Sequence, residues 1–102
     1  MQTQQINKIK GLINISNKAG YLIIGSDSLK NYNKKLYLIL YSNNGGKNLQ
    51  KIVTRLNNST NCESVEIDSE DFAKIITIPN CKIVGLKNLG LSKEIIKIIR
   101  GE

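Results

Sequence analysis

The sequence predicts an α/β protein in which helices cover both faces of a small mixed sheet, as a three-layer α/β/α sandwich. Segments with helical and strand-like patterns alternate along the chain, which is typical of such sandwiches. The most apolar segment, residues 36–41, is apolar at every position, as expected of a central strand that is covered on both faces. The 102 residues contain no internal repeat or low-complexity linker, so we expect a single domain over residues 1–102.

The first half of the chain is expected to hold three helices and two strands. Isoleucines and leucines at helical spacing predict an amphipathic helix over residues 5–18. Gly20 follows it at the position where a glycine often caps the C-terminal end of a helix. The other segments are expected to be a strand over 21–24, a helix over 26–33, the buried strand over 36–41, a loop over 42–46 and a helix over 47–57.

The second half is expected to add two strands and two helices. Asp68 or Ser69 is expected to cap a helix that runs to about Ile76, and acidic residues in its first turn favour the helix dipole. Ser92 is expected to cap the last helix, which has an apolar face of isoleucines and a polar face of lysines. The two strands are expected over residues 62–67 and 82–86.

Composition excludes several classes of function. Histidine is absent, so histidine metal sites and histidine-based catalytic relays are excluded. No nucleophile can be paired with a base, and no metal or cofactor site is visible, so we expect a protein that is not an enzyme. Cys62 and Cys81 form no Cys-x-x-Cys pattern and are expected to be reduced and buried. The chain has no membrane-length apolar run and no signal peptide, and we expect a cytoplasmic protein.

The net charge of +7 is unevenly distributed along the chain. Residues 1–60 contain nine Lys and Arg residues and a single acidic residue, Asp27, whereas residues 61–102 contain six basic and seven acidic residues. A general enrichment in Lys, Asn and Ile would not by itself remove acidic residues from the first half. The asymmetry therefore favours a polyanionic partner such as a nucleic acid.

Residues 17–31 contain the most informative candidate site. The helix expected after Gly25 has a small, polar first turn with a lysine on either side. A helix N-terminus exposes unbonded N–H groups, which bind anions. An ordinary helix cap explains the same small residues at least as well, and both interpretations stay open. The candidate residues are Lys18, Gly25, Ser26, Asp27, Ser28 and Lys30.

Three other features do not indicate a site. The sequence Gly45-Gly46-Lys47 is followed by Asn48 rather than by the Ser or Thr of a phosphate-binding loop. The acidic residues between 63 and 71 do not have the spacing of a calcium loop, and we interpret them as a solvated edge. Aromatic residues make up only 5% of the chain, which argues against a platform that stacks successive bases.

Several short motifs follow one another in a recognisable order. They are Lys10-Gly11-Leu12-Ile13, Asn17-Lys18-Ala19-Gly20, Ile24-Gly25-Ser26-Asp27, Leu36-Tyr37-Leu38-Ile39-Leu40, Ser42-Asn43-Asn44 and Val65-Glu66-Ile67. In this order, which covers nearly the whole chain, the sequence resembles the bacterial members of the kink-turn RNA-binding ribosomal protein superfamily. This superfamily includes archaeal and eukaryotic large-subunit proteins.

The resemblance implies a three-layer α/β/α protein that binds a kinked RNA helix without catalysing a reaction. In such proteins a glycine-started helix enters the RNA groove, and a loop before the last strand covers bases that flip out of the bend. The implied partner is structured RNA, either ribosomal RNA or an mRNA leader, with possible ribosome association. By position, Gly25, Ser26, Asp27 and Ser28 would lie at the groove, Lys18 and Lys30 at phosphates, and Ile78, Pro79 and Asn80 in the covering loop.

Two other functions are compatible with the sequence. The first is a protein-interaction module of the translation machinery on the same fold, which would use the acidic edge at residues 63–71. The second is a DNA-binding protein, which would prefer duplex DNA to folded RNA at matched salt.

Overall fold

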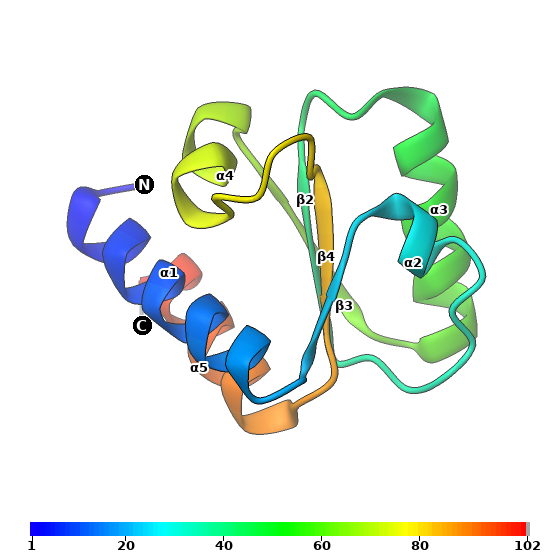
Figure 1. Cartoon of the computed structure of the whole chain (residues 1–102), viewed down its shortest axis with the longest axis horizontal. Helices are drawn as coiled ribbons and strands as arrows, with labels where there is room; N and C mark the ends of the chain where they lie inside the picture. The colour runs from blue at the N-terminus through cyan, green and yellow to red at the C-terminus, as the bar shows by residue number, and fades with distance from the viewer. Residues whose placement is uncertain (102) are drawn as a thin grey trace.

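The computed structural model describes residues 1–101, which form five helices and four strands (Figure 1). In chain order these are α1 (Thr3–Lys18), β1 (Leu22–Ile24), α2 (Ser26–Leu29), β2 (Leu38–Ser42), α3 (Gly46–Thr60), β3 (Glu63–Ile67), α4 (Ser69–Ile75), β4 (Ile83–Leu86) and α5 (Leu89–Arg100). No helix among these residues is long and apolar enough to cross a membrane.

The four strands form one mixed sheet in the order β1-β4-β2-β3. β4 is antiparallel to both of its neighbours, β1 and β2, whereas β2 and β3 are parallel. Figure 1 shows α1, α4 and α5 on one face of the sheet and α2 and α3 on the other. The predicted three-layer α/β/α sandwich with a small mixed sheet is therefore confirmed.

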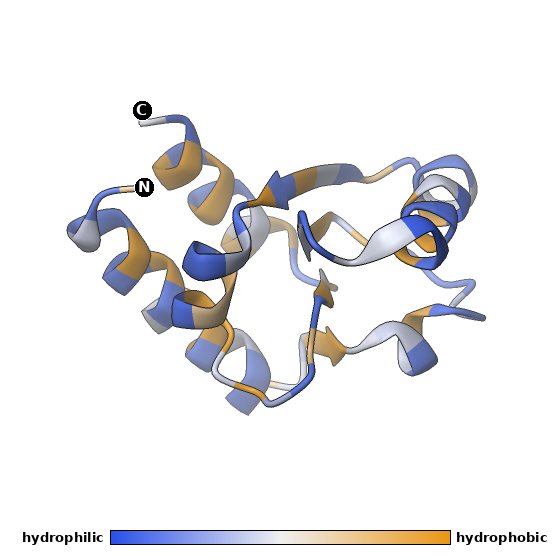
Figure 2. Ribbon diagram, turned by 90° about the horizontal axis from the view of Figure 1, so that it is seen from above, coloured by the Kyte–Doolittle hydropathy of each residue, from blue (hydrophilic) through white to orange (hydrophobic). Residues whose placement is uncertain are grey.

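The two central strands are apolar at nearly every position because they face a core on both sides. Leu38 and Leu40 of β2 pack with α1, α4 and α5, whereas Ile39 between them packs with α2 and α3. β4 alternates in the same way, so each face of the sheet has its own apolar cluster. Figure 2 shows that hydrophobic and hydrophilic residues alternate along α1 and α5, as amphipathic helices require.

Gly85 of β4 makes room for the polypeptide around α2. A Cβ atom at Gly85 would lie 3.0 Å from Cδ2 of Leu29 and 3.3 Å from Cδ2 of Leu36. Both leucines have no exposed surface, and both belong to the cluster between the sheet and α3. The missing side chain at Gly85 therefore allows α2 to pack closely against the sheet.

We predict that Gly85→Val destabilises the protein by about 1–3 kcal/mol, because the added isopropyl group overpacks this cluster. Urea unfolding followed by circular dichroism measures the change. The same Gly→Val change at Gly11 is the control, since a Cβ there meets no atom within 4 Å. Equal effects at the two positions would contradict the role assigned to Gly85.

The structure corrects the length of the second helix, which was predicted over residues 26–33. α2 ends at Leu29 and has a single turn. A longer helix would bond the Leu29 carbonyl to the N–H group four residues on, but this oxygen accepts from the N–H of Tyr32 at 3.1 Å, in a tighter turn, and from Nη2 of Arg55 on α3 at 2.6 Å. A side chain that is distant in the sequence thus helps to end the helix, and local propensity could not reveal it.

The cap of the last helix was also assigned incorrectly. Asn88 caps α5, since its side chain accepts a 2.9 Å hydrogen bond from the N–H of Leu91. Ser92 lies inside the helix, where its hydroxyl donates to the Asn88 carbonyl at 2.6 Å. Asn and Ser are both favoured at helix N-caps, so residue type alone does not distinguish the two positions. The predicted caps at Asp68 and Gly20 are confirmed.

Other boundaries move by a few residues. α1 starts earlier than predicted, α3 is longer at both ends, and β2 is shifted towards Ser42. Cys62 and Cys81 are free thiols, as expected, but both are only half-buried rather than buried.

Candidate functional site

Gly25 joins β1 to α2 in a backbone conformation that only glycine adopts readily. Its φ of 87° and ψ of 159° lie in a region that side chains disfavour. Its N–H group donates a 3.0 Å hydrogen bond to the Ile83 carbonyl, which extends the pairing of β1 with β4. A Cβ at Gly25 would meet no atom within 4 Å, so the requirement for glycine is conformational.

The start of α2 is exposed and has no side-chain cap. Ser26, Asp27 and Ser28 are all exposed, and no side chain accepts a hydrogen bond from the first turn. Gly25 is the N-cap of α2 through its backbone alone, so the interpretation of this segment as an ordinary helix cap stays open beside that of an anion-binding site. Because α2 has a single turn, its dipole is small, and nearby lysines must supply most of the positive charge.

The loop before β4 is a tight turn whose backbone conformation is restricted by its residues. The N–H of Cys81 donates to the Ile78 carbonyl at 3.3 Å, and Asn80 has a φ of 60°. Pro79 cannot adopt a positive φ, so a turn with Pro second and a positive φ third is of type II. Pro79 and Asn80 are exposed, whereas Ile78 packs partly against the core.

The structure brings the start of α2 and this loop together. Ser26 and Asn80 line one small hollow of about 160 Å3. Asn48 of α3 and Lys82 line the same hollow, between the two predicted segments. Segments far apart in the sequence thus share one end of the sheet.

A second hollow, of about 410 Å3, lies next to it between α2 and α3. Lys30 of α2 and Lys51 of α3 line this hollow, and Asp27 is the single carboxylate among its lining residues. The sequence analysis missed Lys51, Asn48 and Lys82. Lys51 and Asn48 had only the pattern of a solvated helix face, and nothing in that pattern indicated that α2 packs beside it.

Lys18 does not join this group. It is the last residue of α1, and β1 separates it from Gly25. The end of α1 lies near the opposite end of β1 from α2 (Figure 1). Lys18 and Lys30 therefore do not line the same hollow, because β1 runs between them, and a phosphate contact by Lys18 stays a prediction.

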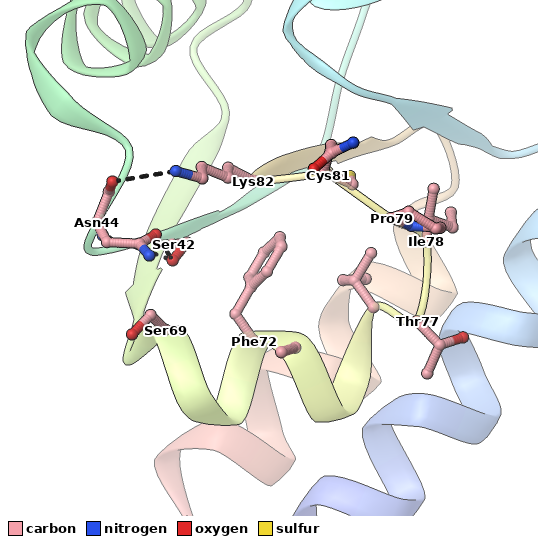
Figure 3. Close-up of a pocket in the computed structure, with 12 residues that line it drawn as sticks. Ser42, Asn44, Ser69, Phe72, Thr77, Ile78, Pro79, Cys81 and Lys82 are labelled. Carbon is pink, nitrogen blue, oxygen red and sulfur yellow. Dashed lines mark hydrogen bonds between the residues drawn. The ribbon is translucent and has the colours of Figure 1, made fainter.

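A larger hollow of about 510 Å3 lies under the loop, between α4 and the start of β4 (Figure 3). Phe72 and Ile76 form its apolar wall. Its polar end is ordered by Asn44, whose side-chain oxygen accepts a 2.6 Å hydrogen bond from the Ser42 hydroxyl. The Asn44 carbonyl also accepts from Nζ of Lys82 at 3.4 Å. The hollow thus offers an apolar wall and polar groups side by side.

Cys81 lines this larger hollow with a half-buried thiol. The thiol donates a 3.3 Å hydrogen bond to the Ile83 carbonyl. Burial raises the pKa of Cys81 and outweighs a lowering contribution from nearby backbone groups of Ile83 and Gly25. The group is therefore a neutral thiol near neutral pH and not an activated nucleophile.

We predict that folded Cys81 is alkylated more slowly at pH 8 than the same thiol in the unfolded chain. The thiolate is the reactive form, and the raised pKa of Cys81 moves its formation to higher pH. Iodoacetamide labelling of a Cys62→Ser variant, followed by mass spectrometry across pH, measures this. A folded-state midpoint below that of the unfolded chain would contradict the assignment.

Arg55 holds α2 in place. Its Nη2 donates to the Leu29 carbonyl at 2.6 Å and its Nη1 to the Tyr32 carbonyl at 3.2 Å. These oxygens belong to the end of α2 and to the turn that follows. Because the guanidinium is bound within the chain, Arg55 positions α2 and is not expected to contact a ligand.

We predict that Arg55→Met costs about 1.5–3 kcal/mol of stability, because two carbonyls lose a charged donor. Hydrogen exchange should show faster opening of the amides of Leu29 and Lys30, which bond within α2. Arg100→Met is the matched control, since the Arg100–Glu63 pair is half exposed and should contribute little. Equal destabilisation by both changes would argue against the role of Arg55.

The acidic residues between 63 and 71 are largely engaged within the chain. Glu63 pairs with Arg100 at 3.0 Å, and Asp71 pairs with the N-terminal amine at 3.0 Å. Asp68 caps α4 by accepting from the N–H of Glu70. Within residues 1–101, no group of three or more Cys, Asp or Glu side chains could hold a metal ion.

Comparisons with known proteins support the fold alone. No family model and no curated protein matches the chain. One similar solved structure is a protein with unknown function from Bacillus halodurans C, with a TM-score of 0.74 and 18% sequence identity. The match covers 91% of this chain and 97% of that chain. At this identity the likeness concerns the α/β architecture and carries no information on function.

Proposed function

We propose that this protein binds structured RNA, without catalysing a reaction, at the end of the sheet where α2 begins. The observation that supports this most is the common hollow of Ser26 and Asn80, with lysines around it and a single carboxylate nearby. We call this region the α2–loop surface. Its residues are Ser26, Asp27, Lys30, Asn44, Asn48, Lys51, Asn80 and Lys82.

The chemistry of the α2–loop surface suits RNA. Lys30, Lys51 and Lys82 are exposed, and lysines bind phosphates with release of counterions. Asparagine side chains both donate and accept hydrogen bonds, so Asn48 and Asn80 match base edges and 2′-hydroxyl groups. The low aromatic content is compatible with recognition of a folded RNA, in which shape and backbone contacts dominate.

The resemblance noted in the sequence makes a kinked RNA the preferred target. Under that resemblance, the start of α2 would enter the groove, while Ile78, Pro79 and Asn80 would cover bases flipped from the bend. The adjacency of these two segments is compatible with one bent RNA that contacts both. We extend the proposal to ribosomal RNA or an mRNA leader as the target, in the cytoplasm and in association with the ribosome.

We predict that Lys30→Glu combined with Lys51→Glu weakens binding to a kinked RNA by about tenfold or more. Two lost phosphate contacts should also reduce the slope of log affinity against log salt by about 1.5. Fluorescence anisotropy with a labelled RNA hairpin that contains a kinked internal loop measures both quantities. Lys87→Glu combined with Lys93→Glu is the control, because both lysines are exposed outside the α2–loop surface and the net charge changes equally.

Three results would contradict the proposal. Equal losses in the two double variants would indicate general attraction of charge rather than binding at the α2–loop surface. A wild-type protein that prefers duplex DNA at matched salt would indicate a DNA-binding protein instead. A wild-type affinity for RNA that is weak and independent of salt would contradict RNA binding as the function of this protein.

A further inference from the structure

A groove between α1 and α5 lies on the face of the sheet away from α2 and α3. The two helices run in opposite directions, since Gln5 near the start of α1 donates to the Ile98 carbonyl near the end of α5 at 2.9 Å. The groove has a volume of about 480 Å3. Residues that line it include Lys8, Gly11, Leu12, Ile15, Glu94 and Ile98.

The surface around this groove is unusually apolar for an exposed region. Ile15 is 56% exposed, and Leu89 and Tyr21, at the same end of the two helices, are 48% and 39% exposed. Within residues 1–101, the other exposed large hydrophobic side chain is Met1. Gly11 adds a notch one turn before Ile15, since a Cβ there would meet no atom within 4 Å. Such concentrated exposure typically marks a protein-interaction site.

The charges around the groove are mainly positive. Lys8 lines it, Lys18 lies three residues after Ile15 on α1, and Lys97 lies three residues after Glu94 on α5. Residues three apart on a helix are neighbours on its surface. None of these three lysines forms an ion pair among the described residues. Three cations and one carboxylate therefore border an apolar floor.

A second copy of the chain would not match these charges. An antiparallel pairing that places Ile15 of one copy over Gly11 of the other, and the reverse, sets Lys8 opposite Lys18 on both sides. A parallel pairing sets Lys8 opposite Lys8. With a net charge of +7 per chain, like charges would meet in either arrangement. The complementary occupant carries carboxylates at these positions.

We propose that the α1–α5 groove docks an amphipathic helix of a partner protein, with an apolar face flanked by Asp or Glu. Ile15, Leu12 and Ile98 contact the apolar face, and the notch at Gly11 receives one of its side chains. Lys18 follows Lys8 by ten positions, a rise of about 15 Å along α1, which corresponds to about three helical turns of the partner. Anchors at positions i, i+4 and i+7 of that helix would follow the groove.

The test uses two synthetic peptides of about 16 residues with the same leucine anchors, one flanked by glutamates and the other by lysines. Anisotropy of the labelled peptides with the full-length protein should show binding of the glutamate peptide at least about tenfold tighter. Methyl NMR should show shifts at Ile15 and Ile98. Ile15→Asn, at an exposed position that circular dichroism can confirm as folded, should weaken binding by about tenfold or more.

A charge exchange provides the matched control. Lys8→Glu combined with Lys18→Glu should reverse the preference in favour of the lysine peptide. Failure of both peptides to bind, or equal binding of both, would overturn the proposal. So would a concentration-dependent dimer that Ile15→Asn abolishes, which would assign the groove to a second copy. Loss of RNA affinity in Ile15→Asn would instead assign the α1–α5 groove to RNA binding. Unchanged RNA affinity would show that the groove is distinct from the α2–loop surface.

Discussion

The antiparallel pairing of β1 with β4 determines where the parts of the candidate site meet. Because β1 and β2 both run opposite to β4, they end where β4 begins. The bond from the Gly25 N–H group to the Ile83 carbonyl continues this pairing by one residue. The start of α2 must then lie beside the turn that leads into β4. In open α/β sheets, ligands commonly bind at the carboxyl ends of strands, and β1, β2 and β3 all end here.

Tertiary contacts, rather than helix propensity, hold α2 in place. A helix of one turn is not stable alone, because nucleation costs more than its few hydrogen bonds return. α2 is held by Leu29 in the core, by the space left at Gly85 and by the guanidinium of Arg55. The charge of the α2–loop surface accordingly comes from lysines on separate elements. Its electrostatics depend on the packing of α2 against α3.

The fold was predictable because the apolar pattern is determined by burial on both faces. The run around Leu38–Leu40 is continuous since successive side chains enter different cores. Which residues come together at the candidate site was harder to predict from the sequence. The sequence around Lys51 has the same pattern as that around lysines on a solvated helix face. Lys51 lies next to Lys30 only because α2 packs beside α3. Lys18 is near Gly25 in sequence, yet β1 runs between them.

The sheet separates the two surfaces proposed for this protein. The α2–loop surface depends on the cluster that contains Leu29 and Leu36, whereas the α1–α5 groove depends on the cluster that contains Ile9 and Ile95. β2 and β4 contribute to both clusters, but successive residues face opposite sides. Substitutions at well-separated sites without shared contacts usually act additively. An RNA and a helical partner could therefore occupy the molecule together, with little coupling except through the charge of the RNA. That charge would oppose an acidic partner only within about a Debye length, about 8 Å at physiological ionic strength.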